Sequence, residues 1–275
     1  MSARSGFVTL RSGARIAYEI HGAEHGGTPA LLLRPLVGAM ALWGSFRDVL
    51  AEHLRVIAFD PLGTGGSSDA ALLATTRDMA HDARAVLDAL GVTTAHVFGI
   101  SFGGMVATWL AIDAPGRVSR LCLASVGPSG CEVAPSAIPG GVALAASLLV
   151  PGVDVSAHLA DAVLSDRLRE EEPERVVAIE EAAAADPTDR VELAKHAVAA
   201  ARHDARDELQ RIVAPTLVLA GDHDELLGAQ PTIELTAAIY GARREVIIGA
   251  GHDLTLERPT ETAHRVAAFF LEGEP

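Results

Sequence analysis

Gly99-Ile100-Ser101-Phe102-Gly103 is the stretch that decides the fold of this chain. A short apolar segment of strand length, residues 95–98, precedes it, and residues 104–112 follow with the length and apolar character of a buried helix. A strand therefore turns directly into a helix, and a serine occupies the bend. Glycines two positions before and after Ser101 suit such a bend, because strand and helix pack too closely there to admit a β-carbon.

The bend also has a chemical consequence. It holds the hydroxyl of Ser101 clear of the sheet, where a substrate can reach it. The backbone amide of Phe102 opens a helix N-terminus, and developing negative charge is favoured at that position. We therefore expect Ser101 to be a nucleophile and the Phe102 N–H to be one donor to an oxyanion.

Strand and helix patterns alternate on both sides of this bend. The other expected strands are residues 7–10, 14–20, 30–33, 55–59, 118–124, 216–220 and 245–248. The other expected helices of this part begin near Trp43 or span residues 76–90, 233–240 and 260–271. Such alternation predicts an α/β fold, a mostly parallel sheet with helices on both faces and functional loops at the carboxyl ends of the strands.

One region departs from the alternation. Residues 129–204 are rich in alanine and charge and contain no strand pattern, and residues 154–168, 174–185 and 188–201 have helix signals. We expect a helical lid over 129–204, inserted into a core formed by residues 1–128 and 205–275. The lid includes apolar residues between 138 and 149, which fit either an apolar substrate group or ordinary packing on the core.

Composition limits the possible partners. The chain has 36 acidic against 22 basic residues, a formal net charge of −14, which argues against nucleic acid and anionic membranes as partners. Its two cysteines, Cys122 and Cys131, form neither a disulfide framework nor a metal site. No signal peptide or membrane-spanning run is present, so we expect a cytoplasmic protein, monomer or homodimer, without cofactor or metal.

A nucleophilic serine needs a base, and the base needs a group that orients it. Eleven histidines are available, and His252 follows the last expected strand, in a loop where Gly249 and Gly251 precede it. Asp224 follows the strand at 216–220. Placement alone leaves His223 as a rival base and Asp222 as a rival acid, the latter alternatively a turn former that bonds to the backbone.

These motifs resemble those of the α/β-hydrolase family. The Gly99–Gly103 stretch resembles its nucleophile elbow, residues 251–259 are similar to its histidine loop, and Asp224 matches the acid of a Gly-x-x-Asp that starts at Gly221. The resemblance covers residues 7–128 and 205–275. It implies an eight-stranded, mostly parallel sheet, with Ser101, Asp224 and His252 as the catalytic residues.

The resemblance also implies a second oxyanion donor, the backbone N–H of Leu36. Here the chain departs from the family, because Arg34-Pro35 replaces the usual His-Gly pair. Pro35 can hold Leu36 through its fixed φ, whereas Arg34 has either a structural role or a role in recognising the substrate. Leu62 and Gly66 stand where arginines are common in the family, which affects contacts between lid and loop.

A serine at position 101 predicts an acyl-enzyme, whereas an aspartate there would indicate a dehalogenase or an epoxide hydrolase. We expect hydrolysis of a small, apolar carboxylic ester or lactone. Two alternatives on the same fold are C–C bond hydrolysis and cofactor-free perhydrolysis. A third, of another class, is a ligand-binding, receptor-like protein, because the fold by itself does not decide the activity.

Overall fold

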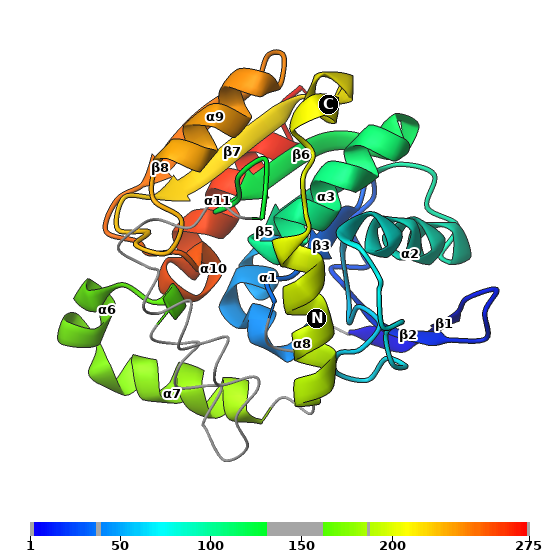
Figure 1. Cartoon of the computed structure of the whole chain (residues 1–275), viewed down its shortest axis with the longest axis horizontal. Coiled ribbons are helices and arrows are strands. Elements are labelled where there is room, and N and C mark those ends of the chain that lie inside the picture. The colour runs from blue at the N-terminus through cyan, green and yellow to red at the C-terminus, as the bar shows by residue number, and fades with distance from the viewer. Residues whose placement is uncertain (1–2, 37–39, 131–161, 186–187, 274–275) are drawn as a thin grey trace.

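The computed structural model describes residues 3–36, 40–130, 162–185 and 188–273, and its centre is an eight-stranded sheet (Figure 1). The strands lie in the order β1-β2-β4-β3-β5-β6-β7-β8. β1 and β2 pair antiparallel, as do β2 and β4, whereas β4, β3, β5, β6, β7 and β8 are parallel neighbours. Their bounds are Arg4–Thr9, Arg15–His21, Ala30–Leu33, Val56–Phe59, Ala95–Ile100, Val118–Ala124, Thr216–Gly221 and Arg243–Ile247 for β1 to β8.

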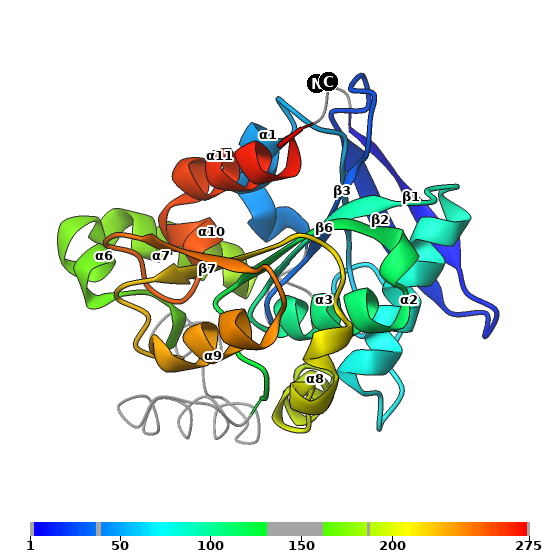
Figure 2. The ribbon, with the colours of Figure 1, turned by 90° about the horizontal axis from the view of Figure 1, so that it is seen from above.

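Helices cover both faces of the sheet (Figure 2). One face carries α2 (Thr76–Ala89), α3 (Phe102–Asp113) and α9 (Gln230–Ala238), and the other carries α1 (Gly44–Leu50) and α11 (Pro259–Phe270). Central strands are therefore apolar on both sides: in β5, Val97 packs into the first layer and Phe98 into the second. Short helices fill connections: η1 (Met40–Trp43), η2 (Pro115–Arg117), η4 (Arg206–Arg211) and α10 (Leu254–Glu257).

The predicted fold class and the eight strands are confirmed. The observed boundaries differ most at the two edges of the sheet and in α9: β1 begins at Arg4 rather than 7, α9 begins at Gln230 rather than 233, and β8 begins at Arg243 rather than 245. Pro231 lies in the first turn of α9, where its missing N–H costs nothing. β8 is an edge strand, and its first two residues are arginines that are at least partly exposed. Its apolar residues therefore begin only after the first residues of the strand.

The described residues between β6 and β7 form three α-helices, here called the inserted helices: α6 (Asp166–Glu171), α7 (Pro173–Ala184) and α8 (Arg190–Ala201). The chain leaves and re-enters the core through one antiparallel contact. The Gly130 N–H donates to the His203 carbonyl at 2.9 Å and the Ala205 N–H donates to the Pro128 carbonyl at 3.0 Å. The domain boundaries 129–204 stay a prediction.

Some expectations fall on residues that are not described. Most of the helix expected at 154–168 and the apolar residues between 138 and 149 lie outside the described residues. Within them, Ser165 caps α6 by accepting a hydrogen bond from the Leu168 N–H. No helix in the described ranges has the length and apolar character needed to cross a membrane.

Candidate active site

The bend at Ser101 is strained. Its φ of 52° and ψ of −120° lie in a region that non-glycine residues rarely adopt, and such strain persists only where the surroundings enforce it. The Ser101 N–H donates to the Ala124 carbonyl of β6 at 2.9 Å. A β-carbon on Gly99 would lie 2.5 Å from the Gly103 carbonyl oxygen, and one on Gly103 would overlap the carbonyl oxygen of Leu33. The elbow glycines are therefore required by close backbone packing.

Three side chains from three strand ends form a continuous hydrogen-bonded row. His252 Nε2 lies 2.8 Å from Ser101 Oγ, and His252 Nδ1 lies 2.9 Å from Asp224 Oδ2. The imidazole is 5% exposed and Asp224 is 7% exposed, so both are shielded from water. With the Nδ1 proton donated to the carboxylate, Nε2 is free to accept the serine hydroxyl proton.

The loops after β7 and β8 bring the acid and the imidazole together. Asp224 follows β7 and its Oδ1 also accepts the Leu227 N–H at 2.9 Å, which holds the carboxylate in its turn. Asp222 bonds to the backbone instead: its Oδ1 accepts the Gly249 N–H at 2.5 Å and so ties the two loops together. The half-exposed His223 lies 3.9 Å from Asp222, and the row to Ser101 does not include it.

The surroundings of His252 favour its charged form. Burial by itself lowers the pKa of the imidazole, but the charge and hydrogen bond of Asp224, with further contributions from Asp253 and Glu257, raise the pKa above its usual value. A base with a raised pKa holds a proton taken from a serine hydroxyl more firmly. The arrangement can therefore transfer a proton between Ser101 and a group bound beside it.

The residue after this serine opens α3. Phe102 is the first residue of α3, and the first N–H groups of a helix have no acceptor within the helix. Leu36 lies in the loop after β3, half-buried against the core layer of α2 and α3. The close packing of Gly103 on the carbonyl groups of Leu33 and Arg34 sets this loop directly against the elbow.

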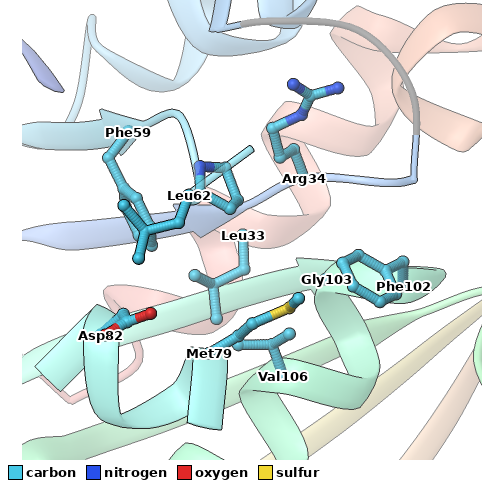
Figure 3. A pocket seen from close by; sticks show the side chains of 10 residues that line it. Leu33, Arg34, Phe59, Leu62, Met79, Asp82, Phe102, Gly103 and Val106 are labelled. Carbon is cyan, nitrogen blue, oxygen red and sulfur yellow. The ribbon is translucent and has the colours of Figure 1, made fainter. Parts of the chain in front are cut away.

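A small, mainly apolar pocket lies beside the elbow (Figure 3). It is lined by Leu33, Arg34, Phe59, Pro61, Leu62, Met79, Asp82, Phe102, Gly103 and Val106. The Arg34 guanidinium is buried and points away from the apolar side chains. Burial, with the neighbouring charge of Asp78, raises the pKa of Asp82 to about 6.

No group of three or more metal-ligating side chains converges in the part of the chain that the structure describes.

The segment between β6 and β7 contacts the candidate site at two points that sequence reasoning missed. The backbone N–H groups of His252 and Asp253 both donate to the Val163 carbonyl at 3.1 Å, and the buried Glu257 carboxylate accepts hydrogen bonds from Ser165. On the other side, the His196 ring of α8 stacks on Phe102. The buried residues Leu193, His196 and Ala199 recur at three-residue spacing, a signal that His196 faces the core.

Comparisons with known proteins agree with this architecture. The family model of the alpha/beta hydrolase fold matches residues 29–259. The solved structure of the enol-lactonase from Burkholderia xenovorans LB400 superposes with a TM-score of 0.83 at 25% identity, covering 96% of this chain and 99% of that one.

Two sequence relatives extend the comparison. The chain is 41% identical to the proposed carbamate hydrolase RutD of Azorhizobium caulinodans over 110 residues, which span 40% of this chain and only 40% of the relative's length. It is 31% identical to the 2-hydroxymuconate semialdehyde hydrolase of Pseudomonas sp. (strain CF600), over 90% of this chain and 88% of the relative. All three proteins are named for reactions on small molecules.

Proposed function

The chain belongs to the alpha/beta-hydrolase fold family, and on this premise we propose that it is a serine hydrolase that cleaves a carboxylic ester or a lactone through an acyl-enzyme. The row from Ser101 through His252 to Asp224 carries the proposal, because it contains a nucleophile, a base and an orienting acid within hydrogen-bond distance of one another.

In the proposed mechanism, Ser101 Oγ attacks the substrate carbonyl carbon while His252 Nε2 accepts its proton. His252 then returns that proton to the departing alkoxide, and the acyl group remains on Ser101. A water molecule, deprotonated by the same imidazole, releases the acid and regenerates the serine. Asp224 stays ionised throughout and holds the imidazole in the required tautomer.

The negative charge that forms on the carbonyl oxygen needs donors in place before the reaction. We assign this role to the backbone N–H groups of Phe102 and Leu36, which lie at the start of α3 and in the loop set against it. Removal of one such donor costs about 3–4 kcal/mol of transition-state stabilisation in comparable enzymes. Neither donor depends on a side chain, so the departure at Arg34-Pro35 is compatible with the mechanism.

The relatives support an attack on a carbonyl carbon rather than one particular bond. They are named for a carbamate, an enol-lactone and a semialdehyde. A semialdehyde contains no ester bond, so that relative keeps C–C bond hydrolysis as the second candidate. We retain residues 129–204 as a lid that selects the substrate, with a small, apolar compound as its ligand.

A substrate panel tests the proposal. Purified wild type and Ser101→Ala are incubated with p-nitrophenyl esters of increasing acyl length, with γ- and δ-lactones, and with a vinylogous 1,5-diketone as the C–C probe. We expect ester or lactone turnover in wild type and a loss of about 10⁴-fold or more in Ser101→Ala. Equal rates in the two proteins would contradict the assignment of Ser101, and turnover of the diketone alone would select the second candidate.

A further inference from the structure

Helix α8 reaches the elbow through one buried histidine. His196 is 1% exposed, and its ring stacks on that of Phe102 with a centroid distance of 5.3 Å and an interplanar angle of 21°. Its Nε2 lies 2.8 Å from the Leu62 carbonyl oxygen, so Nε2 carries the proton and donates it there. The imidazole therefore joins an inserted helix to both the elbow and the loop after β4.

Other side chains of α8 fasten it to the same loop. The Glu192 carboxylate accepts the Ala70 N–H at 2.9 Å, and Lys195 Nζ donates to the Ala70 carbonyl at 2.9 Å. Just before the helix, Thr188 Oγ1 accepts the Gly65 N–H at 3.2 Å. Thr188 and α8 thus supply several of the polar partners of the 60–70 loop, and these contacts hold the part of α8 that contains His196 against the core.

Burial keeps His196 neutral. Burial lowers its pKa, and so do the nearby charges of Arg34 and Lys195, against the opposing effects of the Leu62 hydrogen bond and of Glu192. A neutral imidazole can stack flat on an aromatic ring without desolvating a charge. The contact with Phe102 is therefore a packing contact at neutral pH.

Phe102 is the residue whose position matters most to the proposed oxyanion site. Its amide belongs to the Ser101–Phe102 peptide, and the orientation of that peptide follows from the strained backbone of Ser101. The core constrains this backbone through the packing of Gly103 on Leu33 of β3 and through the hydrogen bond from the Ser101 N–H to Ala124 of β6, whereas His196 contacts Phe102 from an inserted helix. The Phe102 ring is 3% exposed, so its position depends on what packs against it.

We propose that His196 is a positioning residue: by stacking on Phe102 it holds the Ser101–Phe102 peptide in the orientation that stabilises an oxyanion. The reactivity of Ser101 then depends on the position of α8 relative to the core. The inference rests on the proposed function of Ser101. It assigns to an inserted helix a part in the rate of the chemical step, separate from any part in selecting the substrate.

Three substitutions separate the stack from the hydrogen bond. His196→Phe keeps an aromatic partner for Phe102, His196→Gln keeps a donor for the Leu62 carbonyl, and His196→Ala removes both. Val198→Ala, on the exposed face of the same helix, is the matched control. With p-nitrophenyl butyrate we expect His196→Ala and His196→Gln to lower kcat by about 10-fold or more with little change in KM, because a misaligned oxyanion donor acts on the transition state. His196→Phe should retain kcat within about threefold, and Val198→Ala should match wild type.

A second measurement does not depend on finding the right substrate. Diethyl p-nitrophenyl phosphate phosphorylates an activated serine and releases one p-nitrophenolate, and the rate constant of this step is compared across the same variants, with Ser101→Ala as the blank. The His196 variants should rank as they do in kcat. A wild-type protein that reacts no faster than Ser101→Ala would overturn the proposed function itself.

Two outcomes would overturn the role of His196 while leaving the function of Ser101 intact. In one, His196→Ala lowers the melting temperature but keeps the kcat and phosphorylation rate of wild type, which describes a purely structural residue. In the other, His196→Gln retains full activity and His196→Phe loses it, so that the hydrogen bond rather than the stack is what matters.

Discussion

At the scale of single residues, the two aspartates after β7 bind different partners although they are only two positions apart. Asp224 bonds to the imidazole of His252, and Asp222 bonds to the Gly249 backbone. Both are acids next to the same loop, so composition does not separate them. The separation comes from the turn after Gly221, which directs one carboxylate to the site and the other to the loop after β8.

Asp224→Asn and Asp222→Asn form a matched pair for testing this division. We expect Asp224→Asn to lower kcat by about 10⁴-fold, because an amide in place of the carboxylate allows the wrong imidazole tautomer. Asp222→Asn keeps an oxygen that can accept the Gly249 N–H, so its kcat should stay within about threefold of wild type. Ester turnover measured beside circular dichroism checks both, and similar losses in the two variants would contradict the roles assigned here.

At the scale of elements, the contact between β5, α3 and the loop after β3 determines where Ser101 points. Gly103 lies on the carbonyl groups of Leu33 and Arg34, and Gly104 lies on the Val126 side chain. The start of α3 is therefore pressed against two neighbouring strand ends at once. Such contacts leave no room for a methyl group, and the backbone that would have to move also carries the proposed oxyanion donors.

We therefore expect Gly103→Ala to lower the free energy of unfolding strongly and Gly116→Ala to leave it nearly unchanged. The β-carbon added at Gly103 meets backbone, so we expect a loss of about 3 kcal/mol or more in the free energy of unfolding, whereas a β-carbon at Gly116 meets nothing within 4 Å. The change at Gly116 should stay within about 0.5 kcal/mol. Urea unfolding followed by circular dichroism measures both, and equal stabilities would show that the elbow has room to adjust.

At the scale of the whole molecule, the junction between the core and the inserted helices contains a buried, neutral histidine. His203 is 3% exposed, and its Nδ1 lies 3.0 Å from Thr76 Oγ1. Its Nε2 has no hydrogen-bond partner within the described residues. Burial lowers the pKa of His203 to about 4. The folded protein therefore keeps this histidine neutral at the junction where the chain leaves and re-enters the core.

We therefore expect acid to destabilise the protein through His203. Between pH 6.5 and 4 the unfolded chain binds a proton at this histidine and the folded chain does not, so this contribution to stability is complete above pH 6.5 and is lost as pH falls. The difference between pH 7 and pH 5 is about 2 kcal/mol. Urea unfolding at both pH values checks it. His203→Gln should show a smaller loss, and an unchanged loss in that variant would assign the acid sensitivity to other groups.

The local features of this protein could be predicted from the sequence because neighbouring residues determine them. The elbow at Ser101, the apolar strands 30–33 and 118–124 and the amphipathic helix near 76–90 all follow from spacing and from glycine positions. The sequence predicts the boundaries of β1, β8 and α9 less well. At the edge of the sheet few neighbours constrain an element, and the apolar pattern is weak.

The meeting of distant groups was decided only by the tertiary structure. Ser101 and His252 are 151 residues apart and lie 2.8 Å from each other, and His196 reaches Phe102 from an inserted helix that no motif connects with the elbow. Spacing along the chain specifies a turn or a helix face, whereas strand order and packing specify which loops and faces meet. The sequence alone thus determined the fold class and the candidate residues for the proposed chemistry, and three-dimensional packing decided which of them face one another.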